Sequence, residues 1–297
     1  MAITDKKTGP WGLDQVYNKI NQGSIWEYSG QVGLWRAGTN SSGGLGLNQA
    51  PGELNSYSSP VQLPGATWSR DLGKFALTPP TRYSYFAIKT DGTMWGWGYN
   101  DSGSLGNNEN TNYKSSPVQV PGTDWAEGQN KLAAAMQTSA AIRTDGTLWT
   151  FGRNDFGMLG QNAGAPEMRS SPIQIPGSNW DSVAGHAHAF LARKTDGTLW
   201  AWGRNHYGEL GQNSEVDYSS PVQIPGTDWM SIETHGAYNA GFFMIKTDNT
   251  LWAMGRSDQG GLGINENNGH RSSPTQIPGS WNKVTAKVYG ALALRQA

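Results

Sequence analysis

A block of about fifty residues recurs five times in this chain, and this repetition limits the fold more than any other feature. The clearest copy reads KTDGTLWAWGRNHYGELGQN, from Lys194 to Asn213, and a second block, SSPVQIPGTDW, follows it from Ser219. The tryptophans of the Leu-Trp or Met-Trp pair in successive copies lie 60, 54, 51 and 52 residues apart; they are Trp35, Trp95, Trp149, Trp200 and Trp252. A period of this length predicts one domain of repeated units that pack on their neighbours.

Each unit is predicted to be a small antiparallel sheet of three or four strands. Asp196-Gly197 separates two extended runs, which predicts a two-residue hairpin turn with positive φ at both positions. The same dipeptide occurs at Asp91 and Asp145, and Asp248-Asn249 takes its place in the last copy. Within Leu199 to Gly203, Trp200 and Trp202 should share one face of the strand. Pro-Gly in the second block marks a further turn, followed by a single tryptophan in every copy: Trp68, Trp125, Trp180, Trp229 and Trp281.

Such sheets cannot bury both faces alone, and radial stacking would bury the Trp and Leu side chains between them. The five repeat tryptophans, from Trp35 to Trp252, are therefore predicted to form the structural core of the repeats. The composition of 40 Gly and 14 Trp fits many tight turns between short, aromatic-rich strands.

The two ends of the repeat region are predicted to complete each other. The first copy lacks KTDGT before Leu34, and the last copy ends with KVYGALALRQA, from Lys287 to Ala297, which aligns with AHAFLARK of the fourth copy. The C-terminal strand would therefore supply the piece that the first blade lacks. We expect an all-β propeller of five blades, closed by this strand.

The pattern DGxLWxWGxNxxGxLG, together with SSPxxIPG and a tryptophan between copies, resembles the RCC1 repeat over residues 31–297. This resemblance implies an RCC1-like β-propeller. Members of that family usually have seven blades, whereas this chain has five copies. The family also includes modules that bind or inhibit a protein partner, and a similar role is one expectation for this chain.

Residues 1–30 lie outside the repeat and are predicted to contain a short amphipathic helix. Leu13, Val16, Tyr17 and Ile20 follow the i, i+3, i+4, i+7 spacing of one helix face. A helix of about ten residues is marginal alone in water, so it should dock on its own propeller, on a second copy or on another protein. MAITDKKTGPWGLDQVYNKINQGSIW resembles the start of structural proteins of marine tailed bacteriophages, which implies a virion anchor through these four residues and Trp11.

Several classes of function are disfavoured by composition. A formal net charge of -1 without a basic cluster argues against nucleic acid as the main partner, and no apolar run is long enough for membrane insertion. The N-terminus lacks the apolar run of a secretion signal, so synthesis in the host cytoplasm is expected. No cysteine is present, and no nucleophile or phosphate-binding motif occurs, so the chain is predicted not to be an enzyme and to need no cofactor.

The histidines offer one weak alternative to this conclusion. His186 and His188 are two residues apart and would share one strand face, which could hold a metal ion. No third ligand lies nearby in the sequence, so we expect a structural hydrogen-bonding role for His188 and no metal site.

Candidate binding residues lie in the loops that differ between copies, because recognition commonly resides in loops on a rigid scaffold. Tyrosine or a basic residue stands just before the Ser-Ser-Pro of each copy, and both residue types are favoured at interface hot spots. The candidates are Tyr57, Tyr113, Lys114, Arg169, Tyr218 and Arg271. The alternative is that these side chains merely cover the edge of each sheet.

Two functions follow from these observations. The first is a non-enzymatic virion protein, made without a signal peptide, whose N-terminus attaches to other virion proteins and whose propeller contacts a host-surface glycan or protein. Several copies could associate as a homo-oligomer through the predicted helix. The alternative is an intracellular protein-interaction or inhibitor module of RCC1-like type.

Overall fold

The structure is a computed structural model that describes residues 33–40, 42–49, 56–65, 67–69, 84–162, 168–235, 241–257, 260–267, 269–287 and 290–295. All of these belong to the compact unit Gly33–Ala297. The predicted helix and its anchoring candidates Trp11, Leu13, Val16, Tyr17 and Ile20 lie outside the described residues. No helix within the described ranges is long and apolar enough to cross a membrane.

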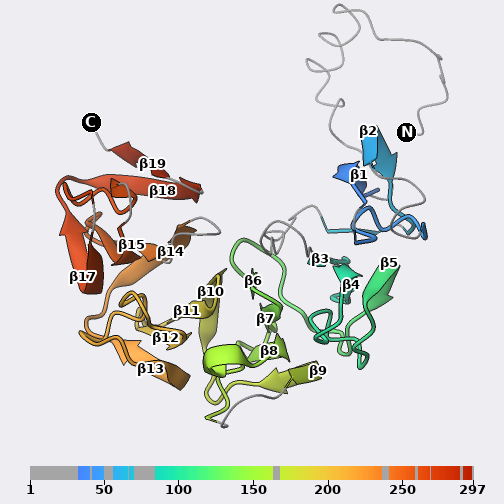
Figure 1. Cartoon of the computed structure of the whole chain (residues 1–297), viewed down its shortest axis with the longest axis horizontal. Helices are drawn as coiled ribbons and strands as arrows, with labels where there is room; N and C mark the ends of the chain where they lie inside the picture. The colour runs from blue at the N-terminus through green and yellow to red at the C-terminus, as the bar shows by residue number, and fades with distance from the viewer. Residues whose placement is uncertain are drawn as a thin grey trace, which may run out of the picture. The chain divides into compact units, whose positions relative to one another are not determined.

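The described residues form six antiparallel sheets whose strands follow one another in chain order (Figure 1). Sheet 1 contains β1 (Trp35–Thr39) and β2 (Ser56–Gln62). Sheet 2 contains β3 (Ser84–Ile88), β4 (Met94–Tyr99) and β5 (Tyr113–Gln119). Sheet 3 contains β6 (Leu132–Ala135), β7 (Thr138–Ile142), β8 (Leu148–Arg153) and β9 (Met168–Gln174), with the short 3₁₀ helix η1 (Asp155–Gly157) after β8.

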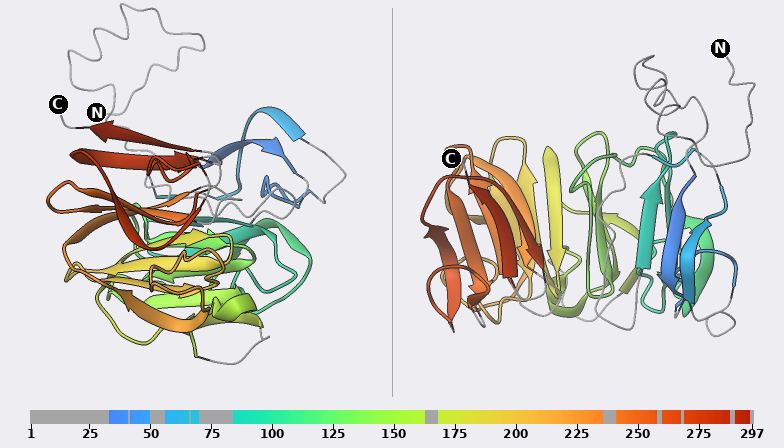
Figure 2. Two further views of the ribbon diagram at one scale, coloured as in Figure 1. Left: turned by 60° about the vertical axis from the view of Figure 1, so that its left-hand side comes forward. Right: turned by 90° about the horizontal axis from the view of Figure 1, so that it is seen from above.

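The C-terminal half repeats this arrangement. Sheet 4 contains β10 (Trp180–His186), β11 (Ala189–Lys194), β12 (Leu199–Gly203) and β13 (Tyr218–Ile224). Sheet 5 contains β14 (Trp229–His235), β15 (Gly241–Lys246), β16 (Leu251–Arg256) and β17 (His270–Ile277). Sheet 6 contains β18 (Trp281–Lys287) and β19 (Gly290–Arg295). Figure 2 shows the antiparallel strands of these sheets from two further sides.

The four strands of a unit follow the repeat closely, so that the predicted three- or four-stranded sheets are present. In sheet 4 the first strand begins at Trp180, the second ends at Lys194 before the Asp-Gly turn, the third begins at Leu199, and the fourth contains Ser-Ser-Pro. Sheet 2 has only the isolated bridge of Trp68 with Lys89 at the place of the first strand. Sheet 1 consists of a third and a fourth strand, and sheet 6 of a first and a second strand.

The turn at Asp196-Gly197 differs from the prediction. Only the second position has positive φ: Gly197 at 79° and, in the last copy, Asn249 at 64°. The loop is wider than two residues, because Lys194 N donates to Thr198 O. The aspartate instead caps the turn with its side chain. Asp196 Oδ1 accepts hydrogen bonds from Thr198 N at 2.9 Å and Thr198 Oγ1 at 2.6 Å.

The cap continues into the next strand. Trp200 Nε1 donates to Thr198 Oγ1 at 3.0 Å, so aspartate, threonine and tryptophan form one chain of hydrogen bonds. The same chain occurs in three other copies, at Asp91, Asp145 and Asp248. The threonine hydroxyl, followed by the threonine N–H, holds the pKa of each of these exposed carboxyls below its ordinary value.

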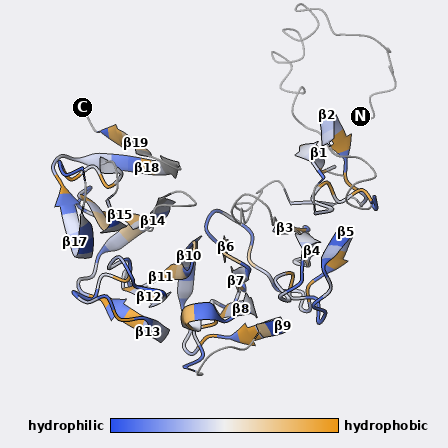
Figure 3. Ribbon diagram, viewed as in Figure 1, coloured by the Kyte–Doolittle hydropathy of each residue, from blue (hydrophilic) through white to orange (hydrophobic). Residues whose placement is uncertain are grey.

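The hydrophobic core lies between neighbouring sheets. One cluster joins sheets 3 and 4 and includes Val183, Phe190 and Trp202, with Trp200 packed against it. Trp200 and Trp202 thus lie on the same face, as predicted. Another cluster joins sheets 4 and 5, and others join sheets 1 and 2, 2 and 3, and 5 and 6. In Figure 3 hydrophilic stretches mark the fourth strands β13 and β17, which are edge strands of their sheets.

The repeat tryptophans lie at the margin of these clusters. Trp95, Trp149, Trp200 and Trp252 are half-buried, and Trp35 is 59% exposed. The tryptophans that open the first strands are more deeply buried, and those from Trp68 to Trp229 are each at most 3% exposed. A lysine or arginine at the end of the second strand lies over both indoles. Lys194 Nζ, for example, is 4.7 Å from the ring centroid of Trp180 and 4.7 Å from that of Trp200.

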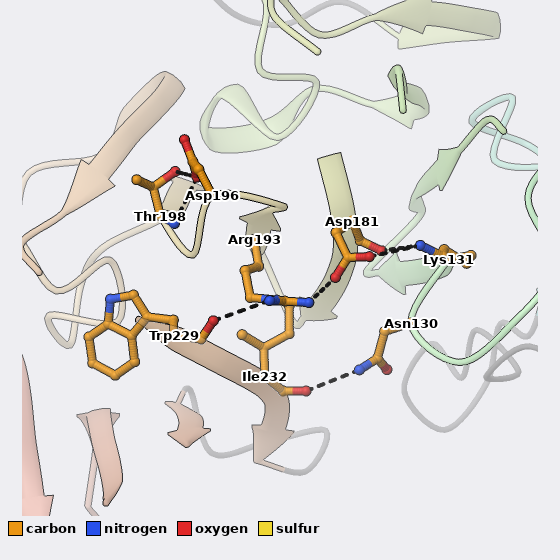
Figure 4. Close-up of polar contacts among 8 residues, drawn as sticks. All are labelled: Asn130, Lys131, Asp181, Arg193, Asp196, Thr198, Trp229 and Ile232. Atoms are coloured by element: carbon orange, nitrogen blue, oxygen red, sulfur yellow. Dashed lines mark hydrogen bonds and ion pairs between the residues drawn. The ribbon is translucent and has the colours of Figure 1, made fainter. Parts of the chain in front are cut away.

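Polar contacts also tie adjacent sheets together (Figure 4). Lys131 Nζ lies 3.2 Å from Asp181 Oδ1, which joins sheets 3 and 4. Arg193 forms an ion pair with the same aspartate, and its NH1 donates to Trp229 O in sheet 5 at 3.2 Å. Asn130 Nδ2 donates to Ile232 O at 3.3 Å, also reaching sheet 5. These contacts fix the spacing of the sheets that carry the surface described next.

Candidate interaction surface

In sheets 1 to 5 a glycine lies at a β-bulge near the end of the third strand, and this glycine positions the residue after it. Gly203 has φ of 104°, and a Cβ there would lie 2.4 Å from His188 O, so a side chain is excluded. The close approach lets Arg204 N donate to His188 O at 2.9 Å. Gly152 has the same relation to Gln137 O, to which Arg153 N donates at 2.9 Å. Arg153 and Arg204 are therefore held beside the turn between the first two strands of their sheets.

Arginines occupy this position in three consecutive sheets, and two aromatic rings lie between them. The guanidinium carbon of Arg204 lies 5.3 Å from the Phe156 ring centroid and 5.7 Å from that of Tyr207. The guanidinium carbon of Arg256 lies 4.7 Å from the same Tyr207 centroid. We call Arg153, Phe156, Arg204, Tyr207 and Arg256 the arginine–aromatic row. The row crosses from sheet 3 to sheet 5, because each aromatic ring contacts the arginine of the following sheet.

Histidines flank this row. The ring of His188 meets Phe156 edge-on at 5.0 Å, and His270 lies 4.8 Å from Tyr207. Arg204 Nε donates to His206 Nδ1 at 2.8 Å, so that this nitrogen acts as an acceptor. Burial, followed by the charge of Arg204, lowers the pKa of His188. The His188 ring is thereby held in its neutral form near neutral pH.

Among the described residues, Asp155 and Glu209 are two acidic side chains beside the row that differ in their burial. Arg153 Nε forms an ion pair with Asp155 at 2.8 Å, and its NH1 donates to Gln137 Oε1 at 3.1 Å. Glu209 is 2% exposed, and burial raises the pKa of its carboxyl to about 7. Its Oε2 accepts a hydrogen bond from Tyr207 N at 2.6 Å. The buried carboxyl thus supports the loop that carries Tyr207, while the arginines give the row a positive character.

Phe156 has an unusual backbone conformation. Its φ of 57° and ψ of 21° lie in the left-handed region, where a bulky side chain is rare and costs roughly 1–2 kcal/mol. The ring is nevertheless 38% exposed, so burial offsets only part of that cost. Three other large apolar side chains are exposed at the corresponding end of their sheets, where the fourth strand begins. They are Tyr113 at 40%, Met168 at 45% and Val216 at 64%. Strain and exposed apolar surface therefore coincide with the arginine–aromatic row.

The binding residues predicted from the sequence lie at this end of the sheets, but they do not form one site. Five of them pair with the bulge glycine of their own sheet: Tyr57 with Gly38, Lys114 with Gly98, Arg169 with Gly152, Tyr218 with Gly203 and Arg271 with Gly255. Tyr113 pairs with Tyr99 one position earlier. Each sheet contributes its own residue on the edge strand, so the six do not converge on a single pocket.

Local contacts occupy some of these side chains. Lys114 forms an ion pair with Glu109, and Arg271 forms one with Glu266. Gln49 Nε2 lies 3.5 Å from the Tyr57 hydroxyl, and Tyr218 packs against the core between sheets 4 and 5. Tyr113 remains the most exposed of the aromatic candidates.

Sequence reasoning missed the arginine–aromatic row. Its signal is present in the repeat, because the residue after the bulge glycine is Thr39 or Tyr99 in the first copies and arginine in the last three. The aromatic residue three positions later, Phe156 or Tyr207, completes the pattern. The lateral contact of one repeat with the next could not be seen from a single copy.

The proposed shared face of His186 and His188 is wrong. His186 ends β10, and His188 lies in the turn before β11, so the strand alternation does not extend to it. His186 is buried against Phe242, with ring centroids 6.0 Å apart, while His188 faces Phe156. Over the described ranges, no group of three or more His, Asp or Glu side chains is placed to hold a metal ion.

Comparison with known proteins agrees with the repeat architecture. The regulator of chromosome condensation (RCC1) repeat matches residues 91–126, 145–191 and 196–235. The chain contains RCC1 repeats. The RCC2 homolog of Danio rerio is 33% identical over 132 residues, which covers 43% of this chain and 26% of that relative. The ultraviolet-B receptor UVR8 of Arabidopsis thaliana is 25% identical over 181 residues, covering 61% of this chain and 41% of the receptor. The chain therefore spans less than half the length of these relatives.

Solved structures overlay most of the chain. Human WBSCR16 has a TM-score of 0.72 at 20% identity, covering 89% of this chain and 68% of that structure. Prp20p from Saccharomyces cerevisiae has a TM-score of 0.68 at 15% identity, covering 90% of this chain and 65% of its own. The fold is an all-β, RCC1-like propeller.

Proposed function

We propose that this chain is a non-enzymatic recognition module that binds a protein partner through the arginine–aromatic row. The observation that carries the proposal is Phe156, an exposed aromatic side chain in a strained backbone conformation beside Arg204. Strained backbone conformations cluster at functional sites, and Arg, Tyr, Phe and Met are enriched in protein interfaces. The exposed side chains of Tyr113, Met168 and Val216 extend the apolar surface at the same end of the sheets.

The relatives support a binding role over a virion role. A structure of yeast RCC1 (Prp20) contains bound Kap60, and the binding of Prp20p to Gsp1p and histones has been described alongside its own structure. These partners belong to those proteins, and their identity does not carry over to this chain. The virion hypothesis remains a prediction from the N-terminal sequence, which the described residues do not include.

The binding role can be tested with variants that lose the exposed side chains of the row but keep the stability of the fold. Phe156→Gly removes the exposed ring and relieves the left-handed strain, so the variant should be at least as stable as the parent protein. Proteins captured by the immobilised full chain from lysate of its source would be quantified by mass spectrometry. We expect Phe156→Gly and Arg204→Ala to lose the same captured protein by at least tenfold.

A matched control has substitutions at the opposite end of the strands in the same blades. Thr144→Ala and Thr195→Ala alter exposed residues next to the Asp-Gly turns and should capture the partner normally. Equal capture by all variants would exclude the row as the binding surface. A Phe156→Gly protein that is markedly less stable would show that the ring serves the fold.

We also propose that the propeller closes with five blades. Sheet 1 supplies a third and fourth strand and sheet 6 a first and second, so together they would make one complete blade. By analogy with the pairing of β11 and β12, Ala291 would face Ala37, Ala293 would face Trp35, and Leu294 would face Leu34. Closure would cover Trp35 and Leu294, which are each 59% exposed in their separate sheets.

The pairing would also repeat the contact seen in other sheets, where a lysine or arginine lies over two tryptophan rings. Arg295 pairs with Trp281 as Lys194 pairs with Trp180. In a closed blade it would lie over both Trp281 and Trp35. Because the chain has no cysteine, Ala37→Cys with Ala291→Cys should form a disulfide within one molecule under mild oxidation.

The same experiment distinguishes other arrangements of the ends. A disulfide between two molecules would indicate exchange of the terminal strands, and no disulfide would contradict the register. Ala37→Cys with Thr227→Cys, placed in the turn before β14, is the control pair and should remain reduced.

A further inference from the structure

A pocket of about 310 Å³ lies between sheets 4 and 5, and none of its lining residues belongs to the arginine–aromatic row. Its walls include Trp229, Trp252, Pro225 and Pro274. Lys246 and Gln212 add polar groups to this apolar surface. The volume lies at the lower end of the range for small-molecule sites.

The polar groups of the pocket are held in fixed positions. Lys246 Nζ lies 4.7 Å from the Trp229 ring centroid and 5.2 Å from that of Trp252. Gln212 Nε2 donates to Leu210 O at 3.2 Å and to Gln223 O at 3.0 Å. These bonds use the amide hydrogens of Gln212, so its carbonyl oxygen is the group offered to a ligand.

Asn213, another residue of the pocket lining, has a left-handed backbone conformation of the kind that glycine adopts most easily. Its φ is 54°, and its N–H donates to Ser272 O in the next blade at 2.5 Å. Asn213 belongs to the pocket lining, and its side chain amide has both a donor and an acceptor. The pocket therefore combines flat apolar walls with an ammonium group and two amides.

The same set of residues recurs one blade earlier. Gln161 Nε2 donates to Leu159 O at 3.3 Å and to Gln174 O at 2.9 Å, as Gln212 does in the later copy. Lys194 lies over Trp180 and Trp200, and Asn162 has φ of 52°. Between sheets 2 and 3 the pattern changes, because Asn107 replaces the glutamine and Arg143 the lysine. An equivalent set of side chains thus lies between sheets 3 and 4.

This chemistry matches a sugar ring. The C–H face of a pyranose can pack on an indole or a proline ring, while its hydroxyls donate to the carbonyl of Gln212 and accept from Lys246 and Asn213. A proline-rich peptide would also pack on these walls. Its proline rings have no N–H or O–H to donate to Gln212, so the sugar satisfies more of the pocket.

We propose that the pocket between sheets 4 and 5, and the equivalent set of side chains between sheets 3 and 4, each bind one neutral hexose or N-acetylhexosamine unit of a glycan. Two equal sites on one rigid scaffold would give a glycan with several such units a higher avidity than a single sugar. This binding is separate from the protein partner proposed above, since the two surfaces share no residue.

The test is saturation-transfer difference NMR of the full chain with the methyl glycosides of glucose, galactose and mannose, and with N-acetylglucosamine. We expect saturation of the ring C–H protons of at least one of these sugars. Asn162→Gly with Asn213→Gly keeps the positive φ but removes both side chain amides. Titration calorimetry should show affinity for that sugar lowered about tenfold.

Two further variants keep the result interpretable. Gln161→Leu with Gln212→Leu should also weaken binding, because it removes the carbonyl acceptor while preserving volume. Asn249→Gly, at an Asp-Asn turn with φ of 64°, is the matched control and should bind normally. No saturation of any of the four sugars, unchanged affinity in both double variants, or binding of decaproline in place of the sugars would overturn the proposal.

Discussion

Gly208 packs against Ser272 of the next blade so closely that a Cβ on the glycine would lie 2.4 Å from the serine Cα. The same contact joins Gly43 with Ser115, Gly103 with Ser170 and Gly157 with Ser219. In each case the N–H of an asparagine later in the same loop donates to the carbonyl of that serine, at 2.5 Å for Asn213 and Ser272. These contacts are the backbone connection between successive blades.

Gly208→Ala is expected to destabilise the protein by about 2–5 kcal/mol, because left-handed strain and overpacking against backbone both contribute. The free energy of unfolding would be measured by urea denaturation. Gly226→Ala is the control: its φ is 99°, but the nearest atom to a Cβ lies 3.5 Å away on a lysine side chain. A Gly208→Ala loss no larger than that of the control would contradict close packing at this site.

Gly260→Ala tests ring closure through the same contact. Gly260 has φ of 72°, as Gly208 does, but the nearest described atom to its Cβ is Asn267 Oδ1 at 3.5 Å. In the closed propeller we propose, the serine that matches Ser272 is Ser58 of sheet 1. Gly260→Ala should then destabilise the protein as much as Gly208→Ala. In an open chain only the left-handed strain of roughly 1–2 kcal/mol would remain.

The capped turns predict a loss of stability in acid. The pKa of Asp196 is lowered from 3.8 in the folded state, chiefly by the Thr198 hydroxyl, so the folded protein favours the carboxylate. The stabilisation is present above pH 3.8 and is lost as the pH falls through the lower folded pKa. The urea midpoint should fall between about pH 5 and about pH 2, and less steeply in Asp196→Asn. An identical pH profile for the variant would show that the cap does not contribute.

Glu209 predicts the opposite slope in a different pH range. Its pKa is raised from 4.5 to about 7 by burial, so the folded state keeps a proton that the unfolded state has released. Stability should decrease from about pH 4.5 to pH 7, by roughly 3 kcal/mol at most. Glu209→Gln should remove this decrease and be more stable than the parent protein at about pH 8. Urea denaturation at about pH 5 and about pH 8 measures both, and a parent protein with equal stability at the two values would contradict the shift.

The repeat made much of the fold predictable. The Asp-Gly turns and the Leu-Trp strands were placed correctly, because hairpin turns and strand alternation depend on residues near one another in the chain. The conformation of the turn was wrong in detail. Asp196 caps it through a side chain hydrogen bond, and only Gly197 needs positive φ. Dipeptide preference does not distinguish the tight turn from the wider one.

Tertiary structure alone decided which side chains meet. Arg204 lies between Phe156 of the preceding blade and Tyr207 of its own, and Lys131 reaches Asp181, 50 positions along the chain. Such contacts depend on the rotation and spacing of one sheet relative to the next, which no single repeat encodes. The sequence by itself determined the repeated unit and the positions of its turns and strands, because these follow from local backbone preference and the period of the strand. The packing of neighbouring blades decided where charge, aromatic rings and strain come together.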